Sequence, residues 1–244
     1  MSRRWPTLLS YFAEGVSHLV WPPRCLACTT PTAAEHFCAD CVAALTTDHP
    51  HRCVFCAGNL GPHADAAKPC LRCPKAKYAF TSAVRFGLYA DAVRLAVLAM
   101  KQPDGELLAF RLGELWATHR RAELLASSPQ LVVPVPLHWR RRWSRGYNQS
   151  EELARGLAGT LGLPLAAHAL SRPNAGEVQA HQSATARWDN VKGVFAVRSP
   201  DAVRGVRILL IDDVLTTGAT CHNAALALSA AGAAQVHVAV VAHR

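Results

Sequence analysis

One stretch near the C-terminus, residues 207–220, most constrains how this chain can fold. Residues 208–211 are all apolar, two adjacent acids follow them, and a turn rich in threonine and glycine comes next. A short apolar run of this kind is typical of a strand buried in a parallel sheet. The turn leads into an alanine- and leucine-rich helical pattern. The sequence therefore predicts a strand, a loop and a helix of an α/β fold.

The residue types in this turn favour an anion, while the two acids before it favour a different group. Backbone N–H groups at a helix N-terminus bind anions, and glycine lets the backbone approach a ligand closely. Asp212 and Asp213 repel phosphate but suit sugar hydroxyls or Mg²⁺. A phosphorylated sugar would satisfy both halves, whereas an ordinary strand and turn would leave two adjacent carboxylates unexplained. The residues expected at the phosphate are Thr216, Thr217, Gly218, Ala219 and Thr220.

Eight of the nine cysteines lie in residues 25–73 as four C-x-x-C pairs. Two thiolates on one side of a tight turn suit a tetrahedral ion, and sites of four thiolates select zinc. The pairs are Cys25/Cys28, Cys38/Cys41, Cys53/Cys56 and Cys70/Cys73. We predict a double zinc ribbon over residues 21–77 that needs metal to fold. Sequential pairing is the simplest and interleaved pairing stays open, as do disulfides, redox chemistry and an iron–sulfur cluster.

The length and net charge of the chain limit its domain organisation and its possible partners. A chain of 244 residues suits one α/β domain, expected over residues 78–244, with a small appended module. The net charge of +9 favours anionic partners, either nucleic acid or phosphorylated small molecules. Residues 1–20 predict a short amphipathic helix, with a membrane-surface role as the alternative. No run is long enough to span a bilayer and no export signal is evident, so we expect a cytoplasmic protein.

Hydrophobic periodicity and turn residues predict the remaining elements of the α/β domain. We expect strands over residues 79–86, 131–136, 165–170, 194–197 and 236–241. We expect helices over residues 91–101, 106–125, 151–161 and 220–231. Ser150 is the expected cap of the third helix, and Gly232 is expected to end the fourth. Cys221 is interpreted as a small buried thiol, although a helix N-terminus can also activate one.

A basic and aromatic segment, residues 137–149, follows the strand expected over 131–136. It holds four arginines, two tryptophans and a tyrosine. A pyrophosphate clamp and a nucleic-acid surface both fit this composition, as does a solvated loop. Its position after the C-terminal end of a strand favours the clamp, because ligands of α/β sheets bind there. The polar residues 172–186 predict a mobile loop that could cover the site.

Taken together, these motifs resemble the ComF family of bacterial proteins. The resemblance rests on the four cysteine pairs, Pro134-Val135-Pro136, Arg145-Gly146-Tyr147-Asn148-Gln149, Arg187-x-x-Asn190 and the loop at 216–220. That loop is similar to the phosphoribosyl-pyrophosphate (PRPP) signature of type I phosphoribosyltransferases. The resemblance implies an N-terminal double zinc ribbon joined to a type I phosphoribosyltransferase-like parallel sheet flanked by helices. It also implies a link to DNA uptake and competence.

The resemblance further implies displacement of pyrophosphate from PRPP by a nitrogen nucleophile. Asp212 and Asp213 would hold the ribose hydroxyls, directly or through Mg²⁺, and residues 216–220 would hold the 5′-phosphate. The pyrophosphate would face Lys101, Arg140 and Arg145. The flexible loop and acceptor side would include Gln179, Gln182, Arg187 and Asn190. The acceptor is not specified, and two rival functions stay open: a competence factor that binds single-stranded DNA or competence proteins, and a PRPP-sensing regulator without turnover.

Overall fold

The computed structural model describes residues 23–34, 36–65, 68–71, 73, 78–173 and 193–244. The chain divides into two compact units, residues 1–44 and 45–244. This boundary separates the first four cysteines from the second four, so the second group belongs to the larger unit. The division into a module over 21–77 and a domain over 78–244 stays a sequence-based prediction. Outside the described residues lie the expected helix over 1–20, most of the expected mobile loop, and Gln179, Gln182, Arg187 and Asn190.

The described part of the smaller unit is a tight cysteine-bearing turn followed by the start of a helix. The backbone N–H of Cys25 donates to the Thr30 carbonyl at 2.9 Å, and Arg24 forms an antiparallel bridge with Pro31. Helix α2, Ala39–Thr46, begins in this unit directly after Cys38. The C-x-x-C turn is therefore closed by backbone hydrogen bonds that bring its two thiols to one side.

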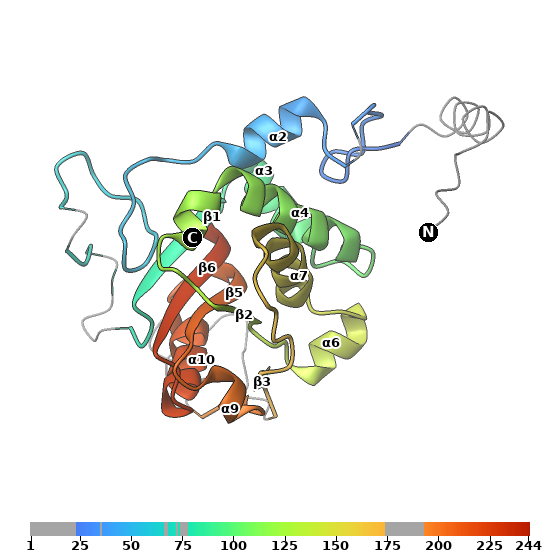
Figure 1. Cartoon of the computed structure of the whole chain (residues 1–244). Helices are drawn as coiled ribbons and strands as arrows, with labels where there is room; N and C mark the ends of the chain where they lie inside the picture. The colour runs from blue at the N-terminus through green and yellow to red at the C-terminus, as the bar shows by residue number, and fades with distance from the viewer. Residues whose placement is uncertain (1–22, 35, 66–67, 72, 74–77, 174–192) are drawn as a thin grey trace, which may run out of the picture. The chain divides into compact units, whose positions relative to one another are not determined.

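A parallel sheet of four strands forms the centre of the larger unit, in the order β1-β6-β5-β2 (Figure 1). Strands β5 and β6 lie in the middle and are almost wholly buried, which explains their continuous apolar sequences. In the register of the sheet, Asp212 stands beside Val240. The strands are β1 (Ser82–Leu88), β2 (Leu131–Pro134), β5 (Arg207–Leu215) and β6 (Gln235–His243).

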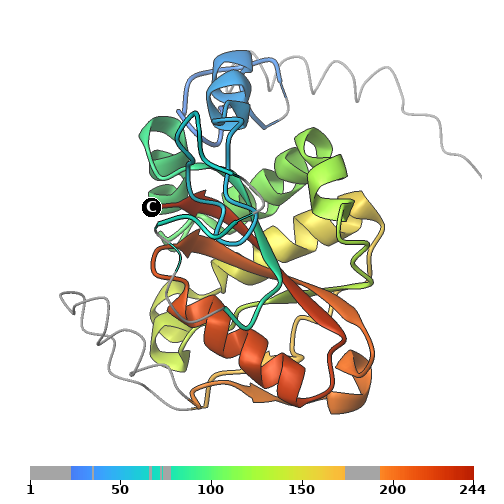
Figure 2. The ribbon, with the colours of Figure 1, turned by 90° about the vertical axis from the view of Figure 1, so that its left-hand side faces the viewer.

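Helices cover both faces of this sheet (Figure 2). Helix α10 packs on one face, and α7, itself packed against α4, lies on the other. Helix α3 contacts β6 and β1. Helices α4 and α7 can approach closely because Gly113 and Gly156 have no Cβ atom. A Cβ at either position would clash with the backbone of the partner helix. No helix in the described part of the chain is both long and apolar enough to cross a bilayer. The helices are α3 (Asp91–Ala99), α4 (Glu106–His119), α7 (Gln149–Leu161) and α10 (Ala219–Ala230).

Three expected helical features differ in the structure. The single helix expected over 106–125 is broken at Arg120, whose ψ of 26° departs from helical geometry, and α5 (Arg121–Leu125) follows. The basic segment forms a short helix, α6 (Trp139–Arg145), capped by the His138 ring and ended by Gly146 at a φ of 88°. Asn148, not Ser150, caps α7, because its side chain accepts a hydrogen bond from the Ser150 N–H at 3.2 Å.

The strands expected over 165–170 and 194–197 are also shorter than predicted. Leu165 forms one parallel bridge with Val132 at the edge of the main sheet. The chain then turns away, and β3 (Leu170–Ser171) pairs antiparallel with β4 (Ala196–Val197). A one-turn helix, α9 (Pro200–Val203), was not predicted; it begins with a proline and follows Ser199. The short β3–β4 pair therefore brings Ser171 and Ala196 side by side.

Candidate functional site

The acid pair lies at the C-terminal end of β5, in the middle of the sheet. Both residues are buried, and their side chains are fixed by several hydrogen bonds. Asp212 Oδ1 accepts from the Ser150 hydroxyl at 3.1 Å and from the Asp213 N–H at 2.9 Å. Asp213 Oδ1 accepts from the Val214 N–H at 2.7 Å. This is the position in which α/β sheets bind ligands, as the sequence predicted.

Two further elements bring side chains to Asp213. Lys101, just beyond α3, places its Nζ 2.7 Å from Asp213 Oδ2. Gln149, the first residue of α7, donates its Nε2 to the same oxygen at 3.1 Å. Arg145 in turn donates to Gln149 Oε1. The structure thus joins predicted residues Lys101 and Arg145 to the acid pair, one directly and the other through Gln149.

Sequence reasoning did not single out Gln149 and Ser150 as contacts of the acids. The only available signal was their place at the end of the Arg145–Gln149 motif and at the start of a helix. Their contacts with Asp213 and Asp212 arise because α7 packs against β5. A helix-start pattern alone does not show which strand the helix meets.

Burial and the neighbouring acid raise the pKa of Asp212 to about 7. Burial disfavours the charged form, and the Asp213 carboxylate adds repulsion. Hydrogen bonds from Asp213 N–H and Ser150, together with the Lys101 charge, act in the opposite direction. A cation bound by the pair would favour ionisation of both acids. The pair therefore has the chemistry of a site that prefers a cation or neutral hydroxyl donors.

The expected phosphate loop joins β5 to α10. Gly218 is the N-cap of α10 and lies in the left-handed region at a φ of 77°, which favours glycine. The Ala219 N–H donates weakly to the Thr217 hydroxyl at 3.4 Å. Cys221, in the first turn of α10, places its Sγ 3.7 Å from Asp212 Oδ2. The loop and the acid pair are therefore neighbours, as a sugar phosphate would require.

The thiol of Cys221 is buried, in agreement with the sequence interpretation. Burial and the nearby Asp212 carboxylate raise the pKa of Cys221 well above its usual range. A protonated thiol donates to the carboxylate and is a poor nucleophile. Cys221 therefore contributes packing and one weak hydrogen bond at the acid pair.

Helix α6 carries the remaining basic residues near the site. Arg140 is exposed and stacks over the Trp139 ring, with its Cζ 5.3 Å from the ring centroid. Arg142 pairs with Glu151 at 3.5 Å. A cavity of about 170 Å³ lies beside this helix, and its lining includes Arg142, Glu151, Arg172 and Arg198. Arg172, which the sequence analysis did not single out, comes directly after β3 and interacts electrostatically with Asp212.

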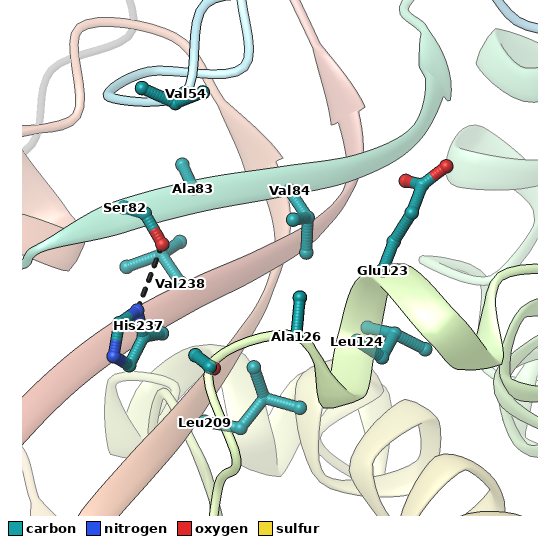
Figure 3. Close-up of a pocket in the computed structure, with 11 residues that line it drawn as sticks. Val54, Ser82, Ala83, Val84, Glu123, Leu124, Ala126, Leu209, His237 and Val238 are labelled. Atoms are coloured by element: carbon teal, nitrogen blue, oxygen red, sulfur yellow. Dashed lines mark hydrogen bonds between the residues drawn. The ribbon is translucent and has the colours of Figure 1, made fainter. Parts of the chain in front are cut away.

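A second cavity, of about 360 Å³, lies at the other end of the strands (Figure 3). Ser82 and His237 meet on its wall, with Oγ and Nδ1 2.8 Å apart. Most of the lining is apolar, from β1, β6 and the segment around Leu124. Burial lowers the pKa of His237, which keeps the ring neutral in this hydrogen bond. Because its lining includes neither the acids nor the threonines of the loop, we do not assign it to the candidate site.

The eight paired cysteines form two groups, and within each group the sulfur atoms lie within 4.8 Å of one another. The grouping is sequential, as in the simplest expectation, and not interleaved. Neighbouring sulfurs are 3.5 Å (Cys56–Cys70) to 3.8 Å (Cys28–Cys38) apart. Four thiolates around zinc at about 2.3 Å would be roughly 3.8 Å apart by tetrahedral geometry. The residues present therefore fit one zinc ion in each group.

Protonation of these thiols depends on their surroundings. Hydrogen bonds with Thr30 lower the pKa of Cys28 to about 6, whereas burial raises the pKa of Cys73 to about 11. A bound dication would favour the thiolate form of every ligand. Metal binding at these groups should therefore release protons and should weaken in acid.

Two family models match the chain. One, described as "Phosphoribosyl transferase domain", matches residues 143–244, and the other, described as "Double zinc ribbon domain", matches residues 16–74. The second match covers all eight paired cysteines and ends one residue after Cys73. With the parallel sheet and the two cysteine groups, these matches define a double zinc ribbon protein with a phosphoribosyltransferase domain.

Relatives extend this similarity over most of the chain. DNA utilization protein YhgH of Salmonella typhimurium is 33% identical over 226 residues, covering 90% of this chain and 96% of the relative. Competence protein F of Haemophilus influenzae is 26% identical over 226 residues, covering 88% and 94%. Competence protein ComFC of Bacillus subtilis is 38% identical over 104 residues, covering 43% and 40%. The chain belongs to the ComF family, as its motifs predicted.

Proposed function

We propose that this chain binds PRPP with Mg²⁺ and transfers the phosphoribosyl group to a nitrogen acceptor. The observation that carries the proposal is the buried acid pair at the end of β5, which contacts both Lys101 and the first turn of α10. Carboxylates for a ribose diol and a helix N-terminus for its phosphate are thus adjacent. The match to a phosphoribosyltransferase domain supports the same donor.

Each charged group has a role in this proposal. Asp212 and Asp213 hold the ribose hydroxyls or the metal, and residues 216–220 hold the 5′-phosphate. Lys101 and Arg145 face the pyrophosphate, with Arg140 as a further contact from the exposed side of α6. The acceptor nitrogen forms a bond to C1 of the ribose while the C1–oxygen bond breaks, and pyrophosphate leaves with the electron pair. Bound Mg²⁺ would neutralise charge on that leaving group.

The acceptor side of the site is also a proposal. Gln179, Gln182, Arg187 and Asn190 are assigned to it from the sequence alone. The polar composition of residues 172–186 suits a loop that closes over the donor and excludes water from the reacting carbon. The acceptor's nitrogen loses a proton in the transfer, and we assign no residue as its base.

We also propose that each cysteine group binds a structural zinc ion. Four thiolates at tetrahedral spacing close each site, which leaves no ligand position for catalysis. The proposed zinc ribbons span residues 21–77, and the phosphoribosyltransferase-like domain spans 78–244. Thiolate ligands need a reducing compartment, which supports a cytoplasmic location.

A second candidate function is binding of single-stranded DNA in competence. The names of the relatives support a link to the use of DNA, and the net charge of +9 is consistent with it. On α6, Trp139 and Trp143 are 53% and 83% exposed beside several arginines. Exposed aromatic rings next to arginine suit stacking on bases. Competence proteins are the alternative partner, and a sensor that binds PRPP without turnover is the third candidate.

Release of pyrophosphate tests the transfer reaction. Purified full-length protein with PRPP and Mg²⁺ should release pyrophosphate when a pool of nitrogen acceptors, including bases and single-stranded DNA, is added. The Asp213→Asn variant should lose this release, and Glu114→Gln is the matched control, because Glu114 is a partly exposed residue of α4 that pairs with Arg111. Binding of PRPP with no release from any pool would favour the sensor. DNA binding that weakens steeply with salt and depends on Arg140 would favour the second function.

A further inference from the structure

Tyr78 stands between the second cysteine group and the expected phosphate loop. Its hydroxyl donates to the Thr217 carbonyl at 3.2 Å. Its ring lies directly against Gly218, where an added Cβ would come within 2.5 Å of Tyr78 Cε1. One side chain thus holds the carbonyl before Gly218 and also occupies the space that a larger residue at 218 would need.

Tyr78 also packs against the second cysteine group, Cys53, Cys56, Cys70 and Cys73. A tyrosine phenol is protonated at neutral pH, so this hydroxyl can donate to the Thr217 carbonyl. The ring also stacks on Phe80, with centroids 4.4 Å apart. Tyr78 therefore contacts the cysteine group, the core of the larger unit and the loop.

The residue after Tyr78 makes a second connection to the same region. The Ala79 N–H donates to His222 Nδ1 at 3.0 Å, in the first turn of α10. Burial lowers the pKa of His222, so its neutral ring nitrogen is available as an acceptor. Residues 78 and 79 thus hold both sides of the turn from the loop into α10.

The cysteine group itself is anchored on the sheet. The Ala83 N–H in β1 donates to the Val54 carbonyl at 2.9 Å. The fully buried Arg85, also in β1, donates to the Ala57 carbonyl at 2.7 Å and pairs with Asp48 at 2.9 Å. Movement of the Cys53–Cys56 turn would therefore be transmitted to β1 and to Tyr78. These contacts all lie within the larger unit.

We propose that Tyr78 is a positioning residue that couples the second metal site to the phosphate loop. When Cys53, Cys56, Cys70 and Cys73 hold their ion, Tyr78 is fixed and keeps Gly218 in its left-handed conformation. Affinity for the 5′-phosphate then depends on the second metal site and not on the first. This inference rests on the proposed function, because it concerns the loop to which we assign the phosphate.

The first experiment separates the loop from the rest of the site by using two probes. Ribose 5-phosphate reports on the loop and acids, and Mg²⁺-pyrophosphate reports on the basic side. Tyr78→Phe should weaken ribose 5-phosphate about fivefold, as for loss of one hydrogen bond, and Tyr78→Ala more than tenfold. Pyrophosphate affinity should stay within about twofold. Tyr89→Ala is the matched control, because Tyr89 contacts Arg244 beyond the end of β1.

The second experiment tests the role of the metal. Cys70→Ser and Cys38→Ser should each reduce bound zinc from two ions to one, measured by mass spectrometry of the metal. Only Cys70→Ser should weaken ribose 5-phosphate, by more than tenfold, and speed amide hydrogen exchange in residues 216–222. Equal effects of the two variants, or no effect of Cys70→Ser, would overturn the coupling.

Amide exchange keeps the inference testable apart from the proposed function. If wild-type protein binds neither PRPP nor ribose 5-phosphate, the proposed function fails. In that case faster exchange of residues 216–222 in Tyr78→Ala, with both zinc ions retained, would still support the positioning role. Unchanged exchange in Tyr78→Ala, or unchanged ribose 5-phosphate affinity in both Tyr78 variants, would overturn it.

Discussion

Removing Asp48 should destabilise the larger unit strongly, because it would leave the buried Arg85 guanidinium without its main counter-charge. The side chains of Arg85 and Asp48 are 0% and 1% exposed, and their ion pair measures 2.9 Å. Arg85 Nε also donates to both Asp48 oxygens at 3.2 Å. Among the residues that the structure describes, the guanidinium would keep only the neutral acceptors on Ala57 and Asn59 after Asp48→Ala.

The expected loss follows from this burial. Breaking a buried ion pair by removing one partner costs about 3–5 kcal/mol. The two remaining acceptors place the expected value near the lower end, about 3 kcal/mol. That is a large part of a typical unfolding free energy of about 5–15 kcal/mol. The double variant Arg85→Met, Asp48→Leu should recover much of this loss, because it removes both charges and fills the space.

Urea unfolding followed by circular dichroism, with zinc present, measures the difference in unfolding free energy. Asp201→Ala is the matched control, because its pair with Arg204 joins side chains that are 97% and 69% exposed. That control should change stability by less than about 1 kcal/mol. A loss below about 1 kcal/mol for Asp48→Ala would refute the reasoning, as would a double variant less stable than both single ones.

Three other perturbations test separate parts of the structure. Without Mg²⁺, the unfolding free energy should fall as pH rises from about 4 to 8. The reason is that the pKa of Asp212 is raised to about 7 in the folded state, so a proton that favours the folded state is lost over this range. Urea unfolding at a series of pH values measures this slope, and Asp212→Asn should remove the part due to Asp212. Gly156→Ala should destabilise the protein by about 2 kcal/mol, because the added Cβ would clash with the Phe110 carbonyl. Gly159→Ala should be neutral or slightly stabilising, because the space around Gly159 is open. Thermal unfolding compares the two variants. Chelation of zinc should unfold the described cysteine turns and speed their amide exchange, because metal binding supplies folding free energy in such modules; exchange unchanged after measured metal loss would contradict this.

Local patterns predicted the parts of the site that lie in one continuous stretch. Strand β5, the acid pair and the turn at Gly218 follow each other in sequence, so period, charge and turn chemistry were enough. The cysteine groups were predicted because C-x-x-C spacing is itself a geometric constraint. The pairing order could not be decided from spacing, and the structure groups the cysteines sequentially.

Contacts between distant segments could not be predicted in the same way. Arg85 would be expected to face solvent in a strand, yet it is fully buried because Asp48 supplies its counter-charge 37 residues away. In the sequence, Tyr78 marks only the point where the composition changes. Its contact with Thr217 joins residues that are 139 positions apart. The basic segment was expected as a loop, and α6 forms there because His138 and Gly146 cap it. Each difference is a tertiary contact or cap that periodicity does not encode.

The central claim is that the acid pair and the loop after β5 form a PRPP site. Titration calorimetry of PRPP into the zinc-loaded full-length protein, with and without Mg²⁺, tests it most directly. We predict binding that requires Mg²⁺, is lost in Asp212→Asn and Asp213→Asn, and is retained in Glu114→Gln. Absence of Mg²⁺-dependent binding to the wild-type protein would contradict the claim. Binding by Asp212→Asn or Asp213→Asn that is as tight as that of the wild type would contradict it as well.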